Sequence, residues 1–391
     1  MRIVHSVVRY SLHALLLLLT IAAPAQTLVY FGSYNWNKHY NGLYVYRLDE
    51  RKGKLKKVSV LKDVVNPSYI TLSPDNKFLY ACTETKTTGA GKVSAFKLKA
   101  GGKKIKPLNS QPSGGENPVY LSVHRSGRWL VNANYTEGSI SVYPLKLNGS
   151  IDSMAQHFPF TEGSVNFQRQ DRSHVHAAVF APEHNFVFFP DLGADRIRAF
   201  SCDPNDRLFI EPTKEGFLKA PAGSGPRHLT FHPNRKFAYC IEELSGTISI
   251  YRYNQGTLEF MERASAHPEL LTGGFESSDI QISPDGLFLY AANRGTENNV
   301  AIFAIMPNGV LMLRGYQPVN GVHPRSLAIT PSGQFLVVTN VETSNAVVFK
   351  RDVKTGKLTK TDEELIRNVS CVKFRELDSS INNLKLKQQE R

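Results

Sequence analysis

The sequence predicts an all-β protein folded as a seven-bladed β-propeller. The first observation is a strand–turn–strand unit that occurs six times, at intervals of roughly 47 to 57 residues. The second is that most units are followed by a third apolar strand and a turn into a fourth, which gives four short antiparallel strands per repeat. The third is that no stretch combines sustained helical periodicity with helix caps. Residues 26–375 are therefore expected to form one propeller domain.

Each repeat unit starts with an apolar strand, passes through a tight turn and returns as a second apolar strand. The turn Ser283-Pro-Asp-Gly286 is typical, because Pro, Asp and Gly favour the backbone angles that a hairpin needs. The six units cover residues 66–80, 117–131, 173–188, 226–239, 277–290 and 324–337. Third strands are expected at 92–96, 139–143, 196–200, 247–251, 300–303 and 346–349.

The two ends of the domain are expected to build the seventh blade together. The strands within Leu28–Val60 lack the inner strand that opens every other unit, and Asn368–Phe374 reads as a single strand with no hairpin after it. Joining the two would close the ring without leaving an unpaired strand edge. The polar tail 376–391 is expected to lie outside the domain.

The first 25 residues have the layout of a secretory signal peptide. Arg2 and Arg9 precede the apolar run Ala14–Ala22, and Ala23-Pro-Ala25 gives a small-x-small cleavage pattern. The mature protein is therefore expected to be exported, either periplasmic or secreted. No other stretch approaches 18 consecutive apolar residues, so no membrane span is expected.

Composition narrows the classes of partner. The formal net charge is +13, but the basic residues are dispersed in short runs and no nucleic-acid motif is present, so a basic surface that favours small anions is expected rather than nucleic-acid binding. The spacing of Cys82, Cys202, Cys240 and Cys371 fits no zinc pattern, and apolar strand sequence surrounds most of them, so buried thiols are expected. No metal or other cofactor is predicted.

Polar residues at the strand ends are the candidate functional residues, because the strands themselves are apolar. In a propeller, the inner strands line a central channel, and the loops around them gather on one rim. The positions are His174 and His176, Arg227 and His228, Glu242 and Glu243, Asn293 and Arg294, His323 and Arg325, with Tyr34, Asn134 and Tyr135 at similar places in other blades. His174 and His176 are expected to share one face of a strand. They could ligate a metal, but no further ligand is evident.

Arginines, a carboxylate and histidines at one channel mouth suit a limited range of chemistry. Arginine binds carboxylate, phosphate or a developing oxyanion, and a carboxylate or neutral histidine can accept a proton from water. No Gly-x-Ser-x-Gly elbow is present, which disfavours a serine hydrolase.

Several of these segments resemble the seven-bladed 6-phosphogluconolactonase family, and more distantly the carboxy-muconate lactonising enzymes. The resemblance covers about Leu28 to Phe374. It is carried by Ser173-His-Val-His-Ala-Ala, Asp191-Leu-Gly-Ala-Asp-Arg-Ile, Gly223-Ser-Gly-Pro-Arg-His, Glu243-Leu-Ser, Ser283-Pro-Asp-Gly and Pro324-Arg. It implies lactone chemistry without a metal, with His176 (or His174), Glu243, Arg227 and Arg294 at the channel mouth. The insertion Thr161–Arg172 is expected to reshape the rim.

The sequence thus predicts hydrolysis of a sugar or organic-acid lactone, an anionic small molecule. Arg227 and Arg294 are expected to hold the substrate anion and stabilise the oxyanion, and either Glu243 or His176 to act as the base while the other orients it. Substrate contacts are expected from His174, His228, Asn293, Arg325 and Tyr34. The oligomeric state is left open.

Two other functions use the same residues. A cycloisomerase would close a lactone instead of opening it, and an assay of an open hydroxy acid or muconate against a lactone separates the two directions. A non-catalytic propeller would only bind a partner in the envelope, since the fold alone does not imply catalysis. Unchanged activity and ligand affinity after Glu243→Gln and Arg294→Ala would favour that third function.

Overall fold

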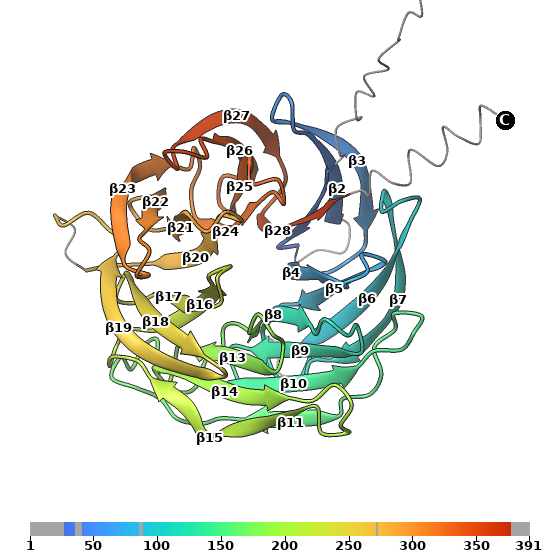
Figure 1. Cartoon of the computed structure of the whole chain (residues 1–391). Coiled ribbons are helices and arrows are strands. Elements are labelled where there is room, and N and C mark those ends of the chain that lie inside the picture. The colour runs from blue at the N-terminus through green and yellow to red at the C-terminus, as the bar shows by residue number, and fades with distance from the viewer. Residues whose placement is uncertain (1–26, 36–40, 86–88, 271–272, 377–391) are drawn as a thin grey trace, which may run out of the picture. The chain divides into compact units, whose positions relative to one another are not determined.

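The computed structural model describes residues 27–35, 41–85, 89–270 and 273–376. The regular elements in these ranges are strands, β1 to β28, arranged as seven four-stranded sheets around a ring (Figure 1). These strands belong to one compact unit. The predicted signal peptide and C-terminal tail lie outside the described residues, apart from Glu376. Within the described ranges, no helix could cross a membrane.

The seven sheets are the blades, numbered here from the first complete repeat. Blade 1 contains β4 (Pro67–Leu72), β5 (Phe78–Thr83), β6 (Lys92–Lys99) and β7 (Lys104–Pro112). Blade 2 contains β8 (Pro118–Val123), β9 (Trp129–Asn134), β10 (Ser139–Pro144) and β11 (Gln156–Pro159). Blade 3 contains β12 (Val179–Phe180), β13 (Phe186–Asp191), β14 (Arg196–Cys202) and β15 (Ile210–Lys219). Blade 4 contains β16 (Pro226–Phe231), β17 (Phe237–Glu242), β18 (Thr247–Asn254) and β19 (Thr257–Ser265).

The remaining blades follow the same pattern until the last. Blade 5 contains β20 (Ser277–Ile282), β21 (Phe288–Asn293), β22 (Asn299–Ile305) and β23 (Leu311–Pro318). Blade 6 contains β24 (Pro324–Ile329), β25 (Phe335–Asn340), β26 (Asn345–Arg351) and β27 (Leu358–Leu365). Blade 7 contains β28 (Val369–Glu376), β1 (Thr27–Ser33), β2 (Asn41–Asp49) and β3 (Lys54–Lys62), so the two ends of the domain close the ring as predicted.

Neighbouring blades are joined by apolar packing and by buried tyrosine hydroxyls. The second strands of the blades are almost wholly buried, and their side chains pack between adjacent sheets. Tyr80, Tyr239 and Tyr290 each donate a hydrogen bond to a glycine carbonyl near the outer strands of the next blade, at 3.1, 2.8 and 2.9 Å. A buried hydroxyl with a partner avoids the cost of an unsatisfied polar group. The four cysteines are buried free thiols.

One backbone hydrogen bond recurs in all seven blades and sets the geometry of the rim. The residue directly after each second strand, here called the rim position, donates its N–H to a carbonyl of the segment that leads into the innermost strand. The rim positions are Glu84, Tyr135, Leu192, Glu243, Arg294, Val341 and Tyr34, and their acceptors are Asn66, Asn117, His174, Gly225, Glu276, His323 and Asn368. Five acceptors have positive φ, between 41° and 66°, which explains the frequent Asn and Gly there.

A β-bulge lies next to this bond in six of the blades. In blade 4, Pro226 pairs with Glu242 and His228 pairs with Ile241, so Arg227 is left without a partner in the ladder. The corresponding residue is skipped in four of the other five, and in blade 5 the ladder passes over both Ser278 and Asp279. A bulge turns the extra side chain away from the regular sheet face. The bulge positions are Ser68, Val119, Arg227, Ser278, Arg325 and Ser370, and His176 holds the corresponding place in blade 3.

Candidate active site

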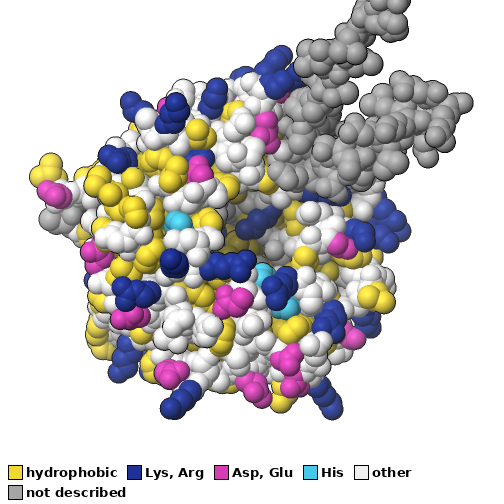
Figure 2. Space-filling view, viewed as in Figure 1, with side chains coloured by type: hydrophobic (Ala, Val, Ile, Leu, Met, Phe, Trp, Pro, Cys, Tyr) yellow, Lys and Arg dark blue, Asp and Glu magenta, His cyan; other side chains and the backbone are white. Residues whose placement is uncertain are grey.

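The rim and bulge positions together surround a cavity of about 230 Å³ at one end of the central channel. Figure 2 shows Lys, Arg and His side chains around the hollow at the centre of this face. The cavity is lined by Glu84, Tyr135, Glu243 and Arg294 from rim positions, Val119, His176 and Arg325 from bulge positions, and Asn117 and Arg169. A larger cavity of about 710 Å³ lies beside β6 and β7 and shares Glu84 with this one. Most of the charged residues predicted for the site line the smaller cavity.

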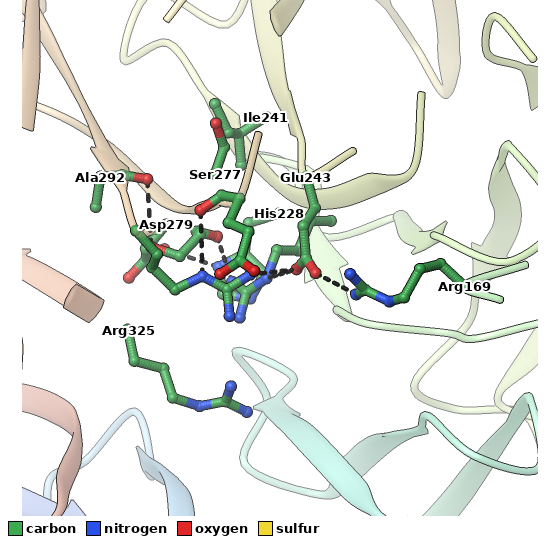
Figure 3. A network of polar contacts seen from close by, with 12 residues as sticks. Arg169, His228, Ile241, Glu243, Ser277, Asp279, Ala292 and Arg325 are labelled. Atoms are coloured by element: carbon green, nitrogen blue, oxygen red, sulfur yellow. Dashed lines mark hydrogen bonds and ion pairs between the residues drawn. The ribbon is translucent and has the colours of Figure 1, made fainter. Parts of the chain in front are cut away.

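Glu243 is the centre of a cluster with three arginines (Figure 3). Arg227 Nε donates to Glu243 Oε2 at 2.7 Å, Arg294 Nη2 lies 2.9 Å from the same oxygen, and Arg169 Nη2 donates to Oε1. Burial alone would raise the pKa of Glu243, but Arg294, Arg227 and Arg169 outweigh it and hold that pKa well below the ordinary value. Glu243 is therefore ionised at neutral pH and a weak proton acceptor.

Arg325 reaches the cavity from another side. Its Nη2 lies 3.4 Å from Glu84 Oε2, and its guanidinium carbon lies 5.1 Å from the centre of the Tyr34 ring. Tyr34 in turn donates to Glu84 at 3.0 Å. Nε and Nη1 of Arg325 make no hydrogen bond to the described residues. They remain available as donors to an anion in the cavity.

His176 is a buried neutral histidine at the edge of the same cavity. Its side chain packs against the rings of Tyr135 and His228, with centroids 5.4 and 5.3 Å away. Burial, followed by the charge of Arg227, lowers the pKa of His176 well below 6.5. Its Nδ1 is buried with no hydrogen-bond partner among the described residues. The ring lines the cavity, so it is placed to meet water or substrate, although Nδ1 itself has no surface open to water.

Comparison with known proteins decides the family. A family model described as a seven-bladed β-propeller lactonase matches residues 28–374. The chain belongs to this lactonase family. It is 39% identical over 346 residues to a 6-phosphogluconolactonase of Formosa agariphila, covering 88% of this chain and 97% of the relative. A 6-phosphogluconolactonase of Bacillus subtilis is 34% identical, with coverage of 88% and 97%.

A solved structure of the lactonase family agrees with the fold. The periplasmic gluconolactonase PpgL of Pseudomonas aeruginosa superposes with a TM-score of 0.84 at 28% identity, covering 90% of this chain and 99% of PpgL. These comparisons confirm the family resemblance of the sequence motifs. They also confirm the predicted seven-bladed fold.

The predicted residues of this lactonase fall into three groups. Glu243, His176, Arg294 and Arg325 line the cavity. Arg227 and Tyr34 stand directly behind them, bonded to Glu243 and Glu84. His228 lies behind Arg227 and does not line the cavity; its Nδ1 is bonded to Asp279 Oδ1 at 2.7 Å.

The third group, His174, Asn293 and Glu242, points elsewhere. His174 stacks on Tyr135 and bonds to its carbonyl at 2.8 Å. The segment that carries it is not a strand, contrary to prediction, because regular pairing in blade 3 begins only at Val179. Asn293 donates to the Ala266 carbonyl at 2.7 Å inside the blade. Glu242 accepts from Ser249 Oγ at 2.7 Å.

Three charged residues at or behind the cavity were not predicted. Glu84 occupies a rim position, so alignment of the repeats could have found it. Arg169 comes from the insertion, where no repeat register applies. Asp279 is visible only through its bond to His228. In the described ranges, no group of three His, Cys, Asp or Glu side chains is placed to hold a metal ion.

Proposed function

We propose that this protein hydrolyses an anionic sugar lactone, with His176 as the general base. The observation that carries the proposal is a neutral imidazole that lines a cavity which arginines surround. The names of the two curated relatives, 6-phosphogluconolactonases, support the substrate class.

The choice between Glu243 and His176 as the base follows from the groups that surround each side chain. Glu243 is bonded to three arginines, and transferring a proton to it would weaken all three ion pairs. His176 forms no ion pair with a carboxylate, and as a neutral ring at the cavity it can accept a proton from water. Its low pKa limits its strength as a base, but it keeps the ring in the accepting form at neutral pH.

The reaction then needs two events at the lactone carbonyl. His176 removes a proton from water as the water oxygen bonds to the carbonyl carbon, and the carbonyl oxygen becomes an oxyanion stabilised by Arg294 or Arg325. The ring C–O bond then breaks, and the protonated His176 returns its proton to the departing ring oxygen. The product carboxylic acid ionises and releases a proton to solvent. Glu243 holds Arg294 and Arg169 in place throughout.

Two finer expectations belong to the same proposal. The cavity has Arg169, Arg294 and Arg325 against Glu84 and Glu243, an excess of positive charge that favours a substrate with a phosphate or carboxylate group. Export to the periplasm or medium is supported by the signal-peptide layout of residues 1–25 and by the relative PpgL, named a periplasmic gluconolactonase.

The decisive experiment measures hydrolysis of sugar δ-lactones with and without a phosphate group. The purified protein is expected to accelerate ring opening and to prefer the phosphorylated lactone by a lower KM. Arg294→Gln should lower kcat on the order of 10² to 10³-fold if it binds the oxyanion, while Arg252→Gln, an exposed arginine on β18 paired with Glu259, should leave kcat unchanged. Lactones opening no faster than in buffer, or full activity in both Arg294→Gln and Arg325→Gln, would overturn the proposal.

A further inference from the structure

A buried pair of side chains behind the cavity has no part in the steps above. His228 on β16 and Asp279 on β20 are 7% and 5% exposed, and neither lines the cavity. His228 Nδ1 lies 2.7 Å from Asp279 Oδ1. Asp279 also accepts the backbone N–H of Leu327 on Oδ2 and its own neighbour Ile280 on Oδ1, each at 2.9 Å. The carboxylate is thus held from three sides, across blades 4, 5 and 6.

These contacts fix the tautomer of His228. An ionised carboxylate only accepts hydrogen bonds, so Nδ1 must carry the proton that joins the two residues. Burial raises the pKa of Asp279, but the His228 contact, the Leu327 N–H and the charge of Lys373 together lower it to about 2, which keeps the carboxylate ionised. Nε2 therefore keeps its lone pair. It lies 3.2 Å from Arg227 Nη1, a group that can only donate.

Arg227 is consequently held at two of its three nitrogens. Nε donates to Glu243 Oε2 at 2.7 Å, and Nη1 donates to the Ser278 carbonyl and toward His228 Nε2. Arg227 is 1% exposed, so its position is determined by these partners and not by solvent. A rotation of its guanidinium would break the contact with Glu243, on which Arg294 and Arg169 depend.

We propose that Asp279 and His228 form a positioning dyad that locks the Arg227 guanidinium and, through it, sets Glu243 for the arginines of the cavity. Asp279 fixes the tautomer, and His228 presents an acceptor where a protonated ring would present a donor. Four side chains face or lie near the His228 ring: Arg227, His176, Tyr120 and Arg325. A protonated His228 would therefore also add a charge beside two arginines. The effect on catalysis rests on the proposed lactone hydrolysis, but the tautomer does not.

Two conservative variants separate a positioning role from a structural one. His228→Asn places its amide nitrogen near the position of Nδ1 and keeps the bond to Asp279, but it loses the acceptor for Arg227. His228→Gln places its amide near the position of Nε2 and can accept from Arg227, but it leaves Asp279 without its side-chain donor. We expect His228→Asn to be the more stable variant and to lose about tenfold in kcat with little change in KM. His228→Gln should be less stable yet more active than His228→Asn.

A positioning role predicts opposite orders for the two variants: His228→Asn is the more stable and His228→Gln the more active. Activity that follows stability, with His228→Gln worse in both, would overturn the proposal. Nitrogen-15 NMR of histidine-labelled protein gives a second reading that needs no substrate. His228 should show a protonated Nδ1 and an unprotonated Nε2 at pH 7. An Nε2-protonated ring would refute the dyad even if lactones are hydrolysed, and an Nδ1-protonated ring would support it even if no lactone is.

Discussion

Glu242 lies inside blade 4, bonded to Ser249 Oγ at 2.7 Å, while the next residue, Glu243, lies at the cavity with Arg227 at 2.7 Å. The same contrast separates Asn293 from Arg294 in blade 5. In these two blades, the last residue of the second strand bonds within the blade, and the rim position after it lines the cavity. Two adjacent polar residues of the same type can therefore have unrelated roles.

At the residue scale, the two histidines of blade 3 make a matched test. His176→Asn removes the unpaired ring from the cavity, so kcat should fall on the order of 10² to 10⁴-fold, the usual contribution of a general base. His174→Asn is the same substitution two residues earlier, outside the cavity, and should cost far less. Steady-state kinetics on one lactone checks both. Equal losses in kcat would mean that His176 has no special part in proton transfer.

The buried histidines also predict how stability depends on pH. Burial and the charges of Arg294 and Arg325 lower the pKa of His323 to about 4. Burial and the charge of Arg227 lower the pKa of His228 to about 4 as well. As pH falls from about 6.5 to about 4, the unfolded chain binds protons there that the folded protein does not, so the free energy of unfolding falls. Urea unfolding between pH 7 and pH 4 measures this loss, as far as the protein remains folded.

The control for this pH dependence is His323→Asn, which removes one of the two groups. His323 lies 3.4 Å from both Arg294 Nη1 and Glu342 Oε1, and these contacts do not include His228. Its variant should lose less stability over the same pH range than the natural protein does. An unchanged slope would show that His323 takes up its proton equally well in both states.

At the scale of elements, the insertion Thr161–Arg172 supplies one of the cavity arginines. Gln170 holds this segment: its Nε2 donates to the Leu192 carbonyl at 2.9 Å, and its Oε1 accepts the N–H of Asn166 at 3.2 Å. Gln170 is 1% exposed, whereas the Arg169 side chain is 38% exposed. The buried glutamine therefore positions its exposed neighbour.

A double-mutant cycle tests that dependence. Arg169→Ala should lower kcat/KM for a phosphorylated lactone about tenfold or more, because one charged donor at the cavity is lost. Gln170→Ala should have a smaller effect of the same kind. If Gln170 acts through Arg169, the double variant should match Arg169→Ala in kcat/KM. Simple addition of the two effects would mean that Gln170 supports the cavity by another route.

The repeat register made much of the site predictable, and the bulge limited the prediction. Because every blade repeats its hairpin, polar residues at the strand ends could be assigned to one rim, and Glu243, Arg294 and Arg325 lie together at one cavity. A bulge moves the position that faces the cavity by one residue along the strand. The sequence does not show directly where a bulge lies. The repeat register alone did not separate Glu242 from Glu243, and the family resemblance selected Glu243. Arg169 lies in a segment with no sister sequence in the other blades.

At the scale of the whole molecule, the ring depends on β28. Tyr30 pairs with Lys373 and Phe31 with Val372 across blade 7, which joins segments from opposite ends of the domain. Val369, Cys371 and Val372 are fully buried. Without this strand, β1 would have an unpaired edge and the buried faces of blades 6 and 7 would meet water.

Two truncations test this closure. A chain ending at Arg367 lacks β28 and should fail to unfold cooperatively or should aggregate. A chain ending at Glu376 keeps β28 and removes only the polar tail, so its melting temperature should equal that of the natural protein. Thermal unfolding followed by circular dichroism compares the two. Cooperative melting of the shorter chain at the natural temperature would mean that six blades and an open seventh suffice.

The bond shared by the rim positions has a consequence for enzyme engineering. It is made by backbone atoms alone, so it does not depend on which side chain a rim position carries. Leu192 and Val341 carry apolar side chains at two of these positions. Leu192 is fully buried and Glu243 holds three arginines, so exchanging either would be costly. Val341 is partly accessible, and a library at this position would explore substrate range at little risk to folding.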